Sequence, residues 1–97
     1  MTVLQKQALI LMQALLGVIS SNFRIVWVAL ENEIVIINIV LEKDLESDVE
    51  EIEDFKGEFE ALQISNINYE VRVIVSSLDI DWPDPSTSIV VYKRRED

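Results

Sequence analysis

The chain has 97 residues, of which 49% are hydrophobic and 27% are charged, a composition typical of one folded domain and not of a disordered chain. It contains no histidine and no cysteine, which excludes disulfides, thiolate nucleophiles, Cys/His zinc sites and catalysis by histidine. Eighteen acidic residues against eight basic ones give a formal charge of −10. We therefore expect a basic protein partner, and no binding to nucleic acid or to an anionic membrane.

The N-terminal segment 2–16 is predicted to form an apolar helix. Thr2 is a suitable N-cap residue, and Gly17 is a suitable C-terminal stop. Lys6 and three glutamines interrupt the apolar run, whereas a signal peptide or a membrane span has a continuous apolar core. We therefore expect a core helix and a cytoplasmic protein, and the lack of cysteine agrees with that compartment.

Two runs rich in β-branched residues, 23–30 and 34–41, are joined by a short polar connection and predict a β-hairpin. Strict alternation divides the first strand into two apolar faces. One face holds Phe23, Ile25, Trp27 and Ala29, and the other holds Arg24, Val26, Val28 and Leu30. Because neither face is clearly polar, either both faces are covered or one of them is a binding surface.

Apolar residues spaced three or four apart predict a second helix over 45–63. These residues are Leu45, Val49, Ile52, Phe55, Phe59 and Leu62. A third strand is predicted over 67–76 and a short fourth strand over 89–92. Two prolines and three aspartates in 79–86 are typical of a loop between these strands. Residues 93–97 are expected to form a solvated tail.

The order α-β-β-α-β-β predicts a single α+β domain over 1–97. We expect a mainly antiparallel sheet of three to four strands, with both helices packed on one face. The other face of the sheet would then lack cover. Its apolar side chains form a candidate surface for a homodimer, and they are Val26, Val28, Ile34 and Ile36.

The second predicted helix carries most of the negative charge of the chain. Ten carboxylates and two lysines between Glu42 and Glu60 give this segment eight of the ten net negative charges. Two interpretations are open: a solvated face that keeps the protein soluble, or a mimic of a polyanion presented to a basic cleft. For the second interpretation, the candidate partner-binding residues are Glu46, Glu50, Glu51, Glu53, Asp54 and Glu58.

The 79–86 loop is a second candidate partner-binding segment. Its candidate residues are Asp79, Asp81, Trp82 and Asp84. Trp82 is either an anchor in a protein interface or a side chain folded back over the edge of the core. The loop lacks the glycine and the terminal glutamate of an EF-hand, so we expect no metal and no other cofactor. Without histidine, cysteine or a glycine-rich phosphate loop, we also expect no enzymatic activity.

Five features occur together in this chain. They are the apolar N-terminal helix, the hairpin around Glu31-Asn32-Glu33, the helix ending Glu58-Phe59-Glu60-Ala61, the aspartate-rich loop with Trp82-Pro83, and the closing strand Val90-Val91-Tyr92-Lys93-Arg94. This pattern resembles small acidic immunity-type proteins that accompany bacterial polymorphic, colicin-like or contact-dependent-inhibition toxins. The resemblance covers most of the chain and transfers no site residue.

The resemblance implies a non-enzymatic protein that binds and neutralises a basic toxin domain, with a nuclease as the favoured target. Two alternatives stay open. One is a homodimeric structural or interaction module that uses the apolar sheet face. The other is a regulator of a basic partner, such as a nucleic-acid-binding protein, that acts through the same charge mimicry.

Overall fold

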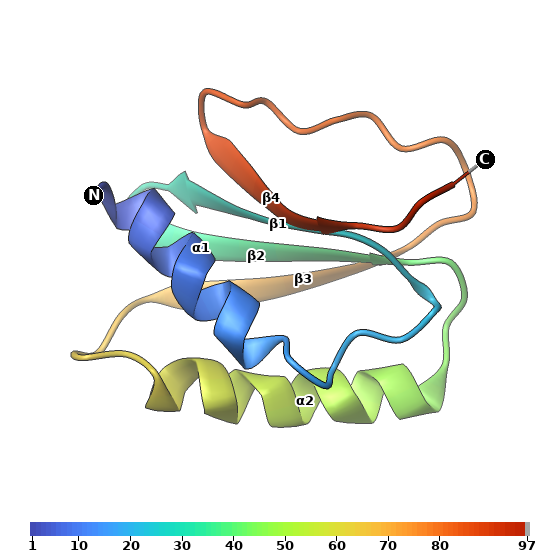
Figure 1. Cartoon of the computed structure of the whole chain (residues 1–97), viewed down its shortest axis with the longest axis horizontal. Coiled ribbons are helices and arrows are strands. Elements are labelled where there is room, and N and C mark those ends of the chain that lie inside the picture. The colour runs from blue at the N-terminus through green and yellow to red at the C-terminus, as the bar shows by residue number, and fades with distance from the viewer. Residues whose placement is uncertain (97) are drawn as a thin grey trace.

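The computed structural model describes residues 1–96, which form a four-stranded sheet and two helices (Figure 1). The elements in chain order are α1 (Val3–Ala14), β1 (Phe23–Glu31), β2 (Ile34–Leu41), α2 (Glu46–Ala61), β3 (Tyr69–Val75) and β4 (Ser88–Lys93). The strands lie in the order β3-β2-β1-β4 across the sheet. The α+β class predicted from the sequence is confirmed. Within the described part of the chain, neither helix is long and apolar enough to cross a membrane.

The sheet is mixed, which corrects the prediction of a mainly antiparallel sheet. β1 runs antiparallel to both of its neighbours, β2 and β4. β3, however, runs parallel to β2. The reason is the connection through α2, which returns the chain to the end of the sheet where β2 began, so that β3 runs in the same direction as β2. This crossover also leaves β3 as an outer strand.

A β-bulge in β1 changes which of its side chains face the helices. The pairing with β2 shifts register between Phe23 and Ile25, so Phe23 shares its face with Val26 and Val28. Val26 and Val28 are fully buried in the core cluster that includes both helices. Their prediction as part of an uncovered dimer face is therefore wrong, because strict alternation does not hold across a bulge.

The face of the sheet away from the helices is less bare than predicted. The other two dimer-face candidates do lie there, but Ile34 is 38% exposed and Ile36 only 1%. Arg24 donates hydrogen bonds to the carbonyls of Ser76 and Leu78, at 2.8 and 2.7 Å. These bonds tie the segment between β3 and β4 to β1. Of the four residues predicted to form the dimer face, only Ile34 is exposed.

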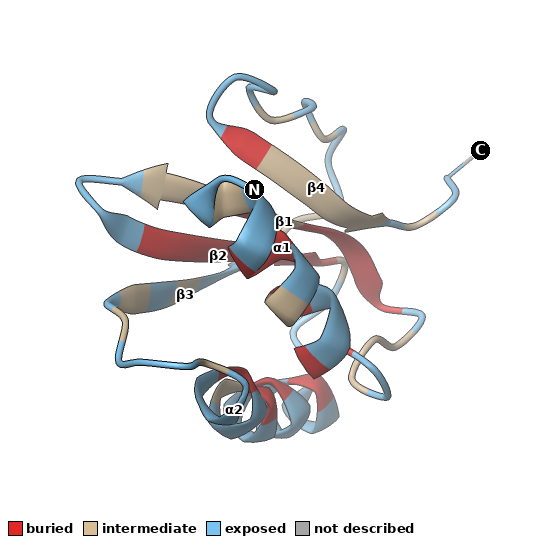
Figure 2. Cartoon of the chain, turned by 60° about the vertical axis from the view of Figure 1, so that its left-hand side comes forward, coloured by how far each residue is buried: buried red, intermediate tan, exposed pale blue. Residues whose placement is uncertain are grey.

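The core lies between the helices and one face of the sheet (Figure 2). α1 contributes Leu11 and α2 contributes Phe55 and Phe59, all of which are almost fully buried. The Phe59 ring lies 6.0 Å from the Phe55 ring and 5.2 Å from the Tyr69 ring of β3, measured between centroids. Both helices therefore cover the same face, as predicted.

Candidate functional site

The six acidic candidates of α2 lie together on its solvent-facing side. Ile52, Phe55 and Phe59 point into the core, so the opposite side of the helix is free. All six candidates are exposed: Glu46, Glu50, Glu51, Glu53, Asp54 and Glu58. Their spacing places them in two neighbouring rows, 46-50-53 and 51-54-58. We call this surface the acidic face of α2.

The protein's own cations barely neutralise this face. Lys56, the only basic residue within α2, pairs with Glu53 at 2.8 Å. Such an exposed pair contributes roughly 0.2–1 kcal/mol to stability and weakens in salt. Within residues 1–96, the other five carboxylates of the face take part in no ion pair. The negative potential of the face is therefore available to a partner.

Two other carboxylates of the acidic segment 42–60 make hydrogen bonds to distant parts of the fold. Asp48 is buried and accepts hydrogen bonds from the Ser20 hydroxyl and the Asn22 side-chain amide, both at 2.8 Å. Glu42 accepts a hydrogen bond from Arg94 at 2.7 Å, which lowers the pKa of this carboxyl. The position of Asp48 was visible in the sequence, because it lies four residues before Ile52 on the buried stripe.

The C-terminal segment is anchored at two of its residues. Arg24 is buried and donates two hydrogen bonds, both at 2.8 Å, to the carboxylate of Glu96. Arg94 adds a contact to Glu96 at 3.0 Å. These guanidinium groups, Arg24 first, lower the pKa of Glu96 to about 2. Of the predicted tail 93–97, Lys93 ends β4 and Asp97 lies outside the described residues.

The 79–86 loop is remote from the acidic face of α2. Figures 1 and 2 both show the segment between β3 and β4 beyond β4, at the opposite end of the molecule from α2. Asp79, Asp81 and Asp84 are exposed, and Trp82 is 59% exposed, so it is not folded back over the core. The structure thus places the acidic helix and this loop on separate surfaces.

The loop does not assemble a metal site. Asp84 accepts hydrogen bonds from the backbone N–H and the hydroxyl of Ser86, at 2.9 and 2.8 Å. These bonds lower the pKa of Asp84, and they give its carboxylate a role in shaping the turn. Within residues 1–96, no group of three or more acidic side chains is arranged to hold a metal ion.

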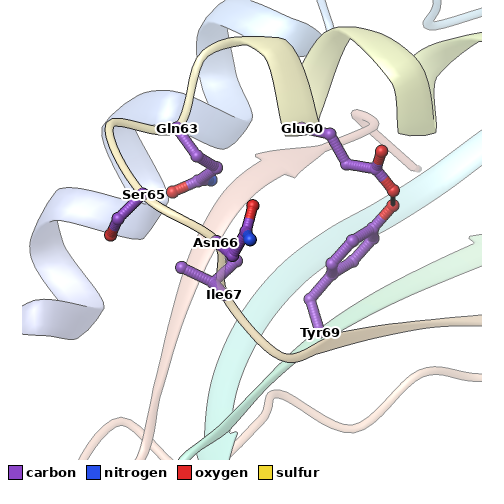
Figure 3. Close-up of a pocket in the computed structure, with 6 residues that line it drawn as sticks. All are labelled: Glu60, Gln63, Ser65, Asn66, Ile67 and Tyr69. Carbon is purple, nitrogen blue, oxygen red and sulfur yellow. Dashed lines mark hydrogen bonds between the residues drawn. The ribbon is translucent and has the colours of Figure 1, made fainter.

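A hollow of about 270 Å³ lies where α2 leads into β3, and sequence reasoning did not find it (Figure 3). The Tyr69 hydroxyl donates to Glu60 across this hollow at 2.5 Å. Burial, together with the Glu60 carboxylate, raises the pKa of Tyr69 to about 12, so this phenol stays protonated at neutral pH and is no general base. Gln63 exchanges hydrogen bonds with Gln7 of α1, at 2.9 and 3.0 Å. The Glu60 contact therefore links α2 to β3, and the Gln63 contact links the end of α2 to α1.

The model of the MafI2 immunity protein family matches residues 5–96. The chain belongs to this family. A search of curated proteins found no match to the chain. The matched segment runs from the first turn of α1 past the end of β4, so it includes both the acidic face of α2 and the 79–86 loop. Membership in the MafI2 immunity protein family confirms the immunity-type assignment and implies a cognate toxin as partner.

Proposed function

We propose that this immunity protein neutralises its cognate toxin by binding a basic domain of the toxin through the acidic face of α2. The favoured target is a nuclease domain, whose substrate is itself a polyanion. The observation that carries the proposal is that five of the six exposed carboxylates of this face form no ion pair within residues 1–96. The toxin's own basic groups would supply the missing partners.

The density of charge on α2 supports mimicry of a nucleic acid. The helix rises 1.5 Å per residue, so residues 46–58 span roughly 18 Å. Six carboxylates over that length give roughly one negative charge per 3 Å, against about one per 3.4 Å along one strand of DNA. A cleft lined with lysine and arginine for phosphate groups would therefore meet a comparable charge density on this helix.

The acidic face also has a cost that a purely solubilising surface would avoid. Glu46, Glu50, Asp54 and Glu58 follow one another at i,i+4 spacing. Each like-charged pair at that spacing destabilises a helix by roughly 0.2–0.5 kcal/mol. A positive partner relieves this repulsion, and long-range attraction of this kind speeds association by about 10–10³-fold at low salt.

Neutralising three carboxylates of α2 tests the proposal. The variant E50Q/E51Q/D54N is expected to bind the cognate toxin domain at least tenfold more weakly, with a smaller dependence on salt. The matched control E31Q/E33Q/E70Q removes the same charge at exposed positions outside α2 and the 79–86 loop, and it is expected to bind nearly as the unmodified protein does. Calorimetry at low and high salt measures both variants. Equal losses in the two variants would reduce the effect to net charge and reject the acidic face as the binding site.

The 79–86 loop is proposed as a separate, secondary contact, and its exposed Trp82 supports this. Because the loop lies at the other end of the molecule from α2, one small toxin domain cannot bury both surfaces without wrapping around the sheet. The variant W82A distinguishes the two surfaces. A loss of affinity larger than that of the α2 variant would make the loop the main binding surface.

A further inference from the structure

The C-terminal half of β3 is an exposed apolar edge of the sheet. Val73, Ile74 and Val75 are 44%, 42% and 49% exposed, and β3 is an outer strand. Proteins usually protect such edges with charged residues, proline, a bulge or a covering segment. Residues 73–75 include neither a charge nor a proline, and β3 pairs with β2 without a register shift from Tyr69 to Val75.

The other outer strand, β4, is better protected. All four of its apolar side chains, those of residues 89–92, are half-buried. Its pairing with β1 includes a register shift between Val26 and Trp27, and its last residue is Lys93. The contrast makes the β3 edge the apolar outer strand that a partner can reach.

The hydrogen bonds at the ends of β3 show which of its backbone groups are free. The Ser76 N–H donates to the Leu41 carbonyl at 2.9 Å, and the Asn68 carbonyl accepts from the Val35 N–H at 3.0 Å. Along a strand, alternate residues direct their backbone groups to the same side. Even-numbered residues of β3 therefore bond to β2, whereas the odd-numbered ones, Val71, Val73 and Val75, direct N–H and C=O groups to the open side.

The side of this edge towards the helices is apolar at one end and acidic at the other. α2 runs opposite to β3 (Figure 1), so the start of α2 lies beside the end of β3. Leu45 and Val49 at the start of α2 are exposed. They lie on the same helical stripe as Glu53 and Glu60, and Glu60 reaches β3 through its hydrogen bond with Tyr69. Ile74 alternates to the other face of the sheet, so we call Leu45, Val49, Val73 and Val75 the β3 edge patch.

We propose that the β3 edge takes up an extended segment of the cognate toxin as a fifth strand of the sheet. Its backbone would pair with the open groups of residues 71–75, a length of roughly 17 Å at 3.3 Å per residue. Main-chain bonds of this kind give affinity, and alternate side chains give specificity. The added segment would carry apolar side chains against the β3 edge patch and basic ones towards Glu53 and Glu60. This strand addition rests on the proposed function, in which the toxin is the partner.

Charge makes a second copy of this chain the poorer occupant. Antiparallel pairing of two β3 edges about a two-fold axis would place both α2 helices on the same face of the joined sheet. Each helix lies in a segment with eight net negative charges, so the two segments would repel each other across the new interface. A toxin strand with lysine or arginine at alternate positions turns this repulsion into attraction.

Amide hydrogen exchange, resolved by residue, tests the strand addition on the unmodified protein. In the free protein, the amides of Val71, Val73 and Val75 should exchange quickly, and those of Arg72 and Ile74 slowly. Adding the toxin domain should slow exchange of the three outward amides at least tenfold. Unchanged exchange in a saturated complex would overturn the strand addition but leave the proposed function standing, whereas absence of any complex would overturn the proposed function.

The variant V73P supplies an independent test. Proline removes the outward N–H of Val73, which the pairing with β2 does not use. We expect at least tenfold weaker toxin binding with an unchanged circular dichroism spectrum, whereas the matched control V73A keeps the N–H and should lose less. Equal binding by V73P and the unmodified protein would contradict the proposal. If V73P does not fold, the exchange experiment decides alone. Protected outward amides in a free protein that sediments as a dimer would assign the edge to a second copy.

Discussion

At the scale of single residues, the hairpin turn shows a conformation that its sequence does not favour. Asn32 and Glu33 have φ angles of 51° and 67°, and positive values at both central residues are typical of a type I′ turn. Asparagine tolerates this conformation, whereas in glutamate the steric clash of the Cβ destabilises it by roughly 1–2 kcal/mol. The polar connection is predictable from the sequence but this strain is not, since the residue types at 31–33 indicate only a polar turn.

Replacing Glu33 by glycine should therefore stabilise the protein. Glycine adopts a positive φ without steric cost but gains more freedom in the unfolded chain, so we expect E33G to raise the free energy of unfolding by about 0.5–1 kcal/mol. Urea denaturation measures the change. The matched control E33A keeps the Cβ and removes the charge. If E33A stabilises as much as E33G, the charge and not the backbone is the cause.

At the scale of elements, the sequence predicted α2 well because its two faces are chemically distinct. Of the predicted apolar stripe, Ile52, Phe55 and Phe59 are buried, and the acidic residues predicted the exposed side. The stripe was wrong at its two ends, where Leu45, Val49 and Leu62 are exposed. β1 was predicted less well. Its bulge exchanged the faces of Val26 and Val28, and nothing in an all-apolar strand marks where alternation breaks. The edge exposure of β3 was not predicted, because it depends on which strand lies beside which.

Gly57 lies within α2, where glycine costs about 1 kcal/mol relative to alanine. A Cβ built at Gly57 meets no atom within 4 Å, so G57A should raise the free energy of unfolding by about 0.5–1 kcal/mol. Thermal and urea denaturation test this. Because Gly57 lies four residues after Glu53 and continues the 46-50-53 row of the acidic face, toxin affinity is measured in parallel. A G57A variant that is less stable than the unmodified protein would contradict an open, helical environment at Gly57.

The burial of the α2 stripe leads to the largest expected loss of stability. Phe55 and Phe59 are almost fully buried, and truncating a buried phenylalanine to alanine costs about 3–5 kcal/mol. F55A and F59A should therefore unfold at much lower urea concentrations. V49A on the same helix, at an exposed position, is the matched control and should change stability by less than about 1 kcal/mol. Similar losses in all three variants would place Val49 in the core.

At the scale of the whole molecule, the strand directions decide which surfaces can act together. Composition and periodicity predicted the α+β class and the helices on one face, because those depend on local pattern. They did not predict that β3 runs parallel to β2, or that the acidic helix and the Trp82 loop lie at opposite ends. Those facts depend on contacts between distant segments. The same holds for Arg24 and Glu96, which are 72 residues apart in the chain.

The contact between Arg24 and Glu96 makes the stability of the whole fold depend on pH. The pKa of Glu96 is about 2, against a usual value of 4.5, so between these values the unfolded chain binds a proton that the folded protein does not. The stabilisation by Glu96 is therefore complete above about pH 4.5 and is lost as the pH falls towards 2.

The variant E96Q lacks this contribution. The difference in free energy of unfolding between the unmodified protein and E96Q should be constant from pH 7 to pH 5 and should shrink below pH 4.5. Because acid protonates the other carboxylates in both proteins, this difference isolates Glu96. A difference that stays constant down to pH 2.5 would show that Glu96 is not held by Arg24 in solution.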